Sequence, residues 1–116
     1  MLMTPWGEHL DENCILTEYP RPQMRRNSYL NLNGRWEYAI TDSDESPRRW
    51  DGTILVPFSP ESALSGVGRS LQPGQTLWYR REVILPQGFI PADGRLLLHF
   101  GAVDQEAAVY WNGRLL

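Results

Sequence analysis

Apolar and polar residues alternate in five short segments of the chain, and each segment is predicted to be a β-strand. Alternation indicates a strand because successive side chains point to opposite faces of a sheet. The segments are 35–41, 53–56, 77–85, 96–100 and 107–111. No stretch keeps the 3.6-residue period of a helix. The pattern therefore predicts an all-β domain.

Proline and glycine divide the chain between these segments. Residues 1–29 contain Pro5, Pro20 and Pro22 and show no period, so they are expected to form an irregular arm. Residues 57–74 are predicted to be a long loop, with one helical turn after Pro60. Loops of this length are usually functional or packed on a neighbour.

A tight turn is predicted close to the end of the sequence. Asn112-Gly113 favours the positive φ angles of a two-residue hairpin turn, yet only three residues follow it. The returning strand is therefore expected to be missing, and the chain is interpreted as a piece of a longer protein. Unpaired strand edges associate readily, so the piece is expected to self-associate near Leu115 and Leu116.

Large apolar side chains at alternate strand positions are the predicted core. Aromatic residues dominate the cores of β-sandwiches, so tryptophans within strands are assigned there as well. The residues expected to be mostly buried are Trp36, Tyr38, Ile40, Val83, Leu96, Leu98, Phe100, Val109 and Trp111.

Composition narrows the classes of function. The 116 residues are 41% hydrophobic and 22% charged, which is typical of one soluble globular domain. The net charge of -3 argues against a nucleic-acid partner. The sequence contains no apolar run as long as a membrane span and no signal-peptide pattern, which predicts a cytoplasmic protein with no membrane partner. The single cysteine, Cys14, excludes an internal disulfide.

The sequence shows no constellation for metal binding or catalysis. His9, Cys14 and His99 lack the spacing of zinc ligands. The acidic stretch 42–45 lacks the glycine and the glutamate that complete a calcium loop. Hence no metal, no cofactor and no catalytic residue is predicted.

Two tryptophans outside the predicted strands, Trp6 and Trp50, are the candidates for ligand binding. Aromatic faces stack on the C–H faces of sugars, but packing against the rest of the domain is the favoured interpretation of both residues. Arg80 and Arg81 could hold a carboxylate, although neighbours in a strand point to opposite faces. One of them is instead expected to form an internal ion pair with Asp104 or Glu82.

Four blocks of sequence carry a resemblance to a known family. They are LNLNGRW at 30–36, ILVPF at 54–58, LWYRR at 77–81, and FGAVD with VYWNG within 100–113. In this order, they are similar to the motifs of the N-terminal sugar-binding domain of glycoside hydrolase family 2, the β-galactosidase and β-glucuronidase family.

This resemblance implies a jelly-roll β-sandwich of the galactose-binding-domain type over residues 30–116, incomplete at its C-terminal end. It implies a non-catalytic sugar-binding or architectural module. Its implied partners are carbohydrate and the immunoglobulin-like domain and (β/α)8 barrel of the same polypeptide. The barrel would carry the two catalytic glutamates that hydrolyse β-glycosides. A stand-alone carbohydrate-binding module and a purely structural interaction domain are the alternatives.

Overall fold

The computed structural model describes residues 3–116, which form a β-rich fold with little helix and small antiparallel sheets. The chain divides into two compact units, the first ending at Leu85 and the second spanning Pro86–Leu116. The β-rich character predicted from the sequence is confirmed. Among the described residues, no helix is long and apolar enough to cross a membrane.

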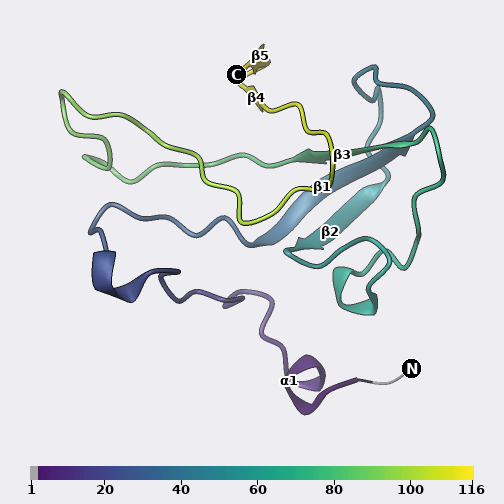
Figure 1. Ribbon diagram of the computed structural model, residues 1–116, viewed down its shortest axis with the longest axis horizontal. Helices are drawn as coiled ribbons and strands as arrows, with labels where there is room; N and C mark the ends of the chain where they lie inside the picture. The colour runs from purple at the N-terminus through teal and green to yellow at the C-terminus, as the bar shows by residue number, and fades with distance from the viewer. Residues whose placement is uncertain (1–2) are drawn as a thin grey trace. The chain divides into compact units, whose positions relative to one another are not determined.

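The first unit contains an antiparallel sheet of three strands, β1 (Gly34–Thr41), β2 (Gly52–Val56) and β3 (Thr76–Arg80). Their order is β2-β1-β3, so β1 is central and pairs on both sides (Figure 1). The register places Trp36 opposite Ile54 and Tyr38 opposite Tyr79. The first predicted strand is thus the element around which this unit is built.

The register gives the sheet two different faces, because directly paired residues point to the same side. One side, here called the aromatic face, carries Trp36, Tyr38, Ile40, Ile54, Leu77 and Tyr79. The other side, here called the polar face, carries Arg35, Glu37, Ala39, Thr41, Thr53, Leu55, Thr76, Trp78 and Arg80.

The core of the described residues is small. Its buried apolar residues are Ile15, Ala39, Ile54 and Leu55, and Ile54 is fully enclosed with 0% of its surface exposed. Ile54 and Leu55 are adjacent on β2, so burial at this strand extends to both faces of the sheet.

Most of the predicted core is not buried. Trp36, Tyr38, Ile40, Val83 and Val109 are only half-buried, whereas Leu96, Leu98, Phe100 and Trp111 are exposed. The reason is that an alternating strand buries its apolar side only under a second layer. Residues 96–100 join no strand ladder within their own unit, so their alternating side chains remain in solvent.

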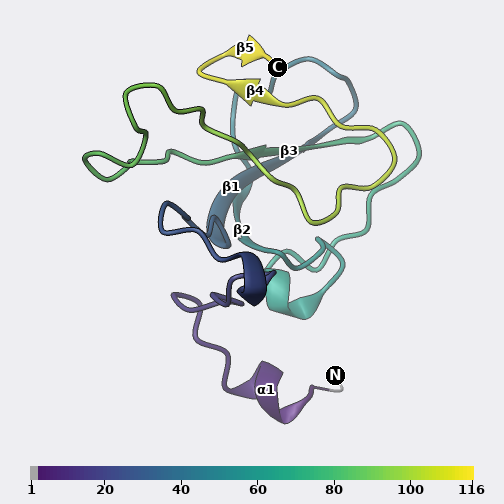
Figure 2. The same ribbon diagram turned by 60° about the vertical axis from the view of Figure 1, so that its left-hand side comes forward.

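The strand boundaries also differ from the prediction. β3 ends at Arg80 instead of continuing to residue 85, and segment 96–100 is not a strand. In the second unit, β4 (Tyr110–Trp111) and β5 (Arg114–Leu115) form a short hairpin, drawn in yellow in Figure 2. The fifth predicted segment, 107–111, is a strand only at its last two residues.

The predicted turn between β4 and β5 is confirmed. Asn112 and Gly113 have φ angles of 50° and 78°, the left-handed conformation that a two-residue hairpin turn requires. The expectation of a missing returning strand is wrong, because Arg114 and Leu115 form β5, which pairs with β4. Tyr110 pairs with Leu115, and the Leu116 amide donates to the Val109 carbonyl at 2.9 Å.

Three short helical turns occur outside the strands: α1 (Pro5–Glu8), η1 (Pro22–Met24) and η2 (Ala63–Ser65). The turn predicted after Pro60 is confirmed as η2. The arm was expected to be irregular, yet Pro5 begins α1, because proline at the first helical position has the required φ and loses no hydrogen bond. Thr4 caps α1 by accepting from the Gly7 amide at 3.2 Å.

Candidate functional site

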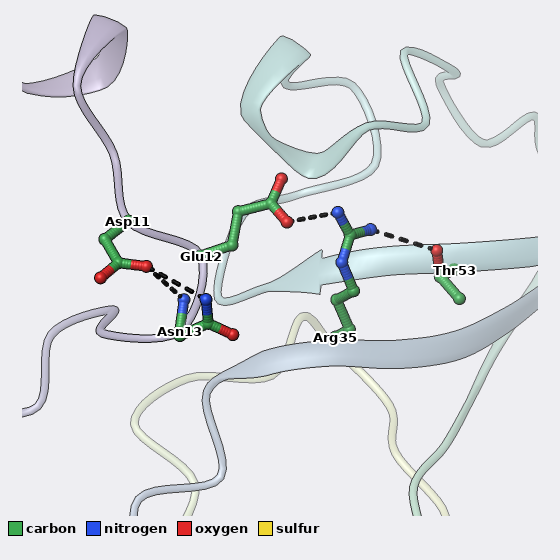
Figure 3. Close-up of polar contacts among 5 residues, drawn as sticks. All are labelled: Asp11, Glu12, Asn13, Arg35 and Thr53. Atoms are coloured by element: carbon green, nitrogen blue, oxygen red, sulfur yellow. Dashed lines mark hydrogen bonds and ion pairs between the residues drawn. The ribbon is translucent and has the colours of Figure 1, made fainter.

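The N-terminal arm is attached to the polar face of the sheet (Figure 3). Glu12 forms an ion pair with Arg35 of β1, and Arg35 also donates from Nη1 to Thr53 Oγ1 of β2 at 3.4 Å. Oδ1 of Asp11 accepts hydrogen bonds from the backbone amide of Asn13 at 2.9 Å and from the side-chain nitrogen of Asn13 at 3.3 Å. These two bonds stabilise the bend of the chain beside Glu12. About half of the Glu12 and Arg35 side chains is exposed, so this ion pair orients the arm more than it stabilises it.

Two asparagines hold the arm more firmly. The side chain of Asn31 donates to the Leu16 carbonyl at 2.7 Å, and that of Asn33 donates to the Ile15 carbonyl at 3.2 Å. Ile15 is only 3% exposed. Part of the arm therefore packs as a structural element of the first unit.

Arg81 fastens the end of β3 to the chain just before β1. Its Nη1 donates to the carbonyls of Leu32 and Asn33 at 2.6 and 2.9 Å. The indole of Trp36 donates to the same Leu32 carbonyl at 2.7 Å, and the Arg81 guanidinium lies 5.9 Å from the Trp36 ring centroid. We call this arrangement the Arg81 clasp. It joins residues that are up to 49 positions apart in sequence.

Glu37, Trp50 and Arg80 meet at the polar face and are here called the Trp50 cluster. Arg80 Nε donates to Glu37 Oε2 at 2.7 Å, and its guanidinium carbon lies 4.6 Å from the centroid of the Trp50 ring. The geometry is fixed by strand pairing, since Glu37 of β1 is directly opposite Arg80 of β3. Trp50 is half-buried and comes two residues before β2.

The two adjacent arginines have separate surroundings, as predicted from strand alternation. Arg80 contacts groups of the polar face, whereas Arg81 contacts Trp36 of the aromatic face. The predicted ion pair exists at Arg80, but naming Asp104 or Glu82 as its partner was wrong. The partner is Glu37, because the antiparallel register places that carboxylate directly across from Arg80.

Three groups of the sheet have a shifted pKa. The hydrogen bond from Arg80 lowers the pKa of Glu37, with partial opposition from desolvation, and Glu37 in turn raises the pKa of Arg80. On the aromatic face, burial raises the pKa of Tyr79, and the negative charge of Glu61 adds to this effect. A general acid needs a raised carboxyl pKa, so the shift at Glu37 is opposite to that role.

The structure places the two candidate tryptophans in different settings. Trp6 lies on α1 and is 80% exposed. The next residue, Gly7, is close to η2, since a Cβ atom there would lie 3.6 Å from the Leu64 side chain. Trp50 instead contacts Arg80 of β3, and the structure shows no contact that joins it to Trp6. Only Trp50 has charged groups arranged around it.

Sequence reasoning missed Glu37 and Arg80 as partners of Trp50. Both residues lie in predicted strands, and their charges are opposite. The missing information was the register, which decides which residues of two strands face each other and which the alternation alone does not provide.

Two other features of the described residues bear on where a ligand could bind. The second unit contains an open apolar groove of about 530 Å³, lined by Leu98, Phe100, Ala107, Ala108, Val109, Leu115 and Leu116. Across residues 3–116, no group of three or more histidine, cysteine, aspartate or glutamate side chains could hold a metal ion. The Trp50 cluster is therefore the best-defined candidate for ligand binding.

No protein-family model matches this chain, and a search of curated proteins also finds no match.

Proposed function

We propose that this chain is the non-catalytic N-terminal module of a family 2 glycoside hydrolase that acts on β-glycosides. The O-glycosyl bond is hydrolysed by a barrel domain elsewhere in the same polypeptide. The module contributes architecture, and its partners are the barrel and an immunoglobulin-like domain.

The observation that carries the proposal is that three of the four family-like blocks assemble within the first unit, while the fourth, within 100–113, belongs to the second unit. Block 30–36 supplies the Leu32 and Asn33 carbonyls and Trp36, while block 77–81 supplies Arg81, which binds both carbonyls. Block 54–58 begins with Ile54, which pairs with Trp36 and is fully buried. The residues of these three blocks thus share a structural role, because their contacts stabilise the three-stranded sheet.

The two faces of the sheet support a jelly-roll sandwich as the finer fold. A sandwich layer has one face directed to the core and one to solvent. The aromatic face carries large side chains that, apart from Ile54, are half-buried or, at Tyr79, exposed, while the opposite face carries the ion pairs. We propose that the aromatic face packs against a second sheet in the whole protein.

The chemistry of the described residues favours an architectural role. A retaining glycosidase needs two carboxyl groups about 5–5.5 Å apart, one of them protonated at neutral pH. Glu37 has a lowered pKa because of Arg80, so it remains ionised and cannot donate a proton.

Hydrolysis assays on two forms of the protein test the proposal. The purified 116-residue chain and the natural polypeptide that contains it are given chromogenic β-galactoside, β-glucuronide and β-mannoside. We expect turnover only by the natural polypeptide. Turnover by the chain alone that disappears when one of its own carboxylates is changed to the amide would overturn the proposal.

A further inference from the structure

The N-terminal arm contains a closed loop, residues 17–30, which is here called the basic loop. At its base, the Asn31 side chain donates to the Leu16 carbonyl at 2.7 Å. Just inside the base, the rings of Tyr19 and Tyr29 meet edge to face, with their centroids 4.6 Å apart. Compact surface loops whose ends lie close together and are packed by their own side chains are frequently functional.

Three exposed arginines give the basic loop its charge. They lie on either side of the short turn η1 and are Arg21, Arg25 and Arg26. Both ion pairs found within residues 3–116 use other arginines, so these three guanidinium groups are unpaired in that range. The sequence has no acidic residue between Glu18 and Glu37. The loop is therefore a local positive surface on a chain whose net charge is -3.

The chemistry of this surface favours carboxylates. A guanidinium has five N–H donors in a planar fork, which matches the two oxygens of a carboxylate with parallel hydrogen bonds. Such charge-assisted bonds are about twice as strong as neutral ones. Because contacts at its base hold the loop closed, less conformational freedom is lost when a partner binds.

Apolar groups among the arginines favour a peptide over a nucleic acid. Met24 lies within η1 and is 64% exposed, and Pro20 and Pro22 are exposed beside it. An acidic peptide can bring carboxylates and apolar side chains to the loop together. A DNA duplex offers mainly phosphate charge, and its high charge density would be repelled by a chain of net charge -3.

We propose that the basic loop is a docking site for an acidic peptide segment of a partner protein. Carboxylates of the segment bind the three guanidinium groups, and an apolar side chain between those carboxylates packs on Met24. This goes beyond the proposed function, because an architectural module needs no such partner. The partner class is argued from the loop alone and does not depend on a hydrolase.

Fluorescence polarisation with labelled probes tests the docking site on the 116-residue chain. The probes are an octapeptide of six glutamates around two leucines, its glutamine counterpart, and a short DNA duplex. We expect the acidic peptide to bind with a Kd on the order of 0.1 mM at low salt. Its affinity should fall about tenfold between about 20 and 300 mM salt, because exposed charges are screened. The other two probes should bind about tenfold or more weakly than the acidic peptide.

Matched variants locate the binding. The double variant Arg25→Gln/Arg26→Gln should weaken binding by about tenfold or more, and its urea midpoint should be unchanged because both residues are exposed. Arg48→Gln/Arg49→Gln removes another adjacent, exposed pair outside the loop, so it should bind as the unchanged chain does. Tyr19→Ala keeps every charge but removes the ring contact at the base, which should weaken binding a few-fold.

Four results would overturn the proposal. These are no binding of the acidic peptide at millimolar concentration, unchanged affinity of Arg25→Gln/Arg26→Gln, an equal loss in Arg48→Gln/Arg49→Gln, and duplex binding as tight as peptide binding. The last result would assign the loop to nucleic acid. None of these measurements involves hydrolysis, so failure of the docking site is distinguishable from failure of the proposed function.

Discussion

Replacing Arg81 with methionine removes the Arg81 clasp and should destabilise the sheet. Methionine keeps much of the apolar stem but cannot donate to the Leu32 and Asn33 carbonyls. A hydrogen bond that involves a charged group contributes about 1.5–3 kcal/mol, and the contact with Trp36 adds about 0.5–1 kcal/mol. Leu32 keeps the Trp36 indole as a donor, and neighbouring contributions do not add fully. We therefore expect a loss of about 2–3 kcal/mol.

The adjacent arginine provides a matched control. Arg80→Met makes the same chemical change one residue earlier, but Arg80 is exposed and its only polar partner among the described residues is Glu37. Exposed ion pairs contribute little to stability, and the contact of Arg80 with the Trp50 ring adds about 0.5–1 kcal/mol, so this variant should lower the denaturation midpoint by clearly less than Arg81→Met does.

Urea denaturation followed by tryptophan fluorescence measures the difference. With a slope of about 1–3 kcal/mol per molar urea, Arg81→Met should lower the midpoint by about 1 M or more. Equal shifts for both variants, or no shift for Arg81→Met, would refute the reasoning that the clasp holds β3 to the start of β1.

Three further predictions concern burial, charge and association. Ile54→Ala should lower the free energy of unfolding by about 2–5 kcal/mol because Ile54 is fully buried. Leu98→Ala should lower it far less because Leu98 is 38% exposed, and equal urea midpoints for the two variants would contradict this. The Glu37 carboxyl should titrate below its ordinary pKa in NMR spectra and return toward it in Arg80→Gln. The pKa of Glu37 is lower in the folded chain than in the unfolded chain, so its ion pair with Arg80 stabilises the fold at pH values above the unfolded-state pKa. This stabilisation is lost as the pH falls through the folded-state pKa of Glu37. The exposed C-terminal tail and the apolar groove beside it should make the isolated chain self-associate, and a monomer at tens of micromolar in a light-scattering dilution series would contradict this.

Strand patterning predicted the parts of the fold that depend on local sequence. The alternating run around Trp36 and Tyr38 forms β1, and the Asn112-Gly113 dipeptide forms the turn that its backbone preference demands. Segment 96–100 has an equally clear alternation but is not a strand. A strand needs a partner that offers hydrogen bonds, and alternation describes only the side chains of the segment itself.

The candidate site was predictable only in part for a similar reason. Position outside the strands identified Trp50 as a ligand candidate, and alternation separated Arg80 from Arg81. The sequence could not show that Glu37 lies across from Arg80, because this depends on the register of two strands that are 43 residues apart at this pair. The role of Arg81 was hidden as well, since its partners are backbone carbonyls, which every residue has.

The position of the catalytic nucleophile tests the central claim most directly. A 2-fluoro glycoside that traps the covalent intermediate of retaining glycosidases would be reacted with the natural polypeptide, and the labelled peptide would be identified by mass spectrometry. The account predicts that the label is on a glutamate outside the 116 residues described by this sequence. A label on one of the 14 acidic residues of this chain would contradict it, and so would a natural polypeptide that is neither labelled nor active on any β-glycoside.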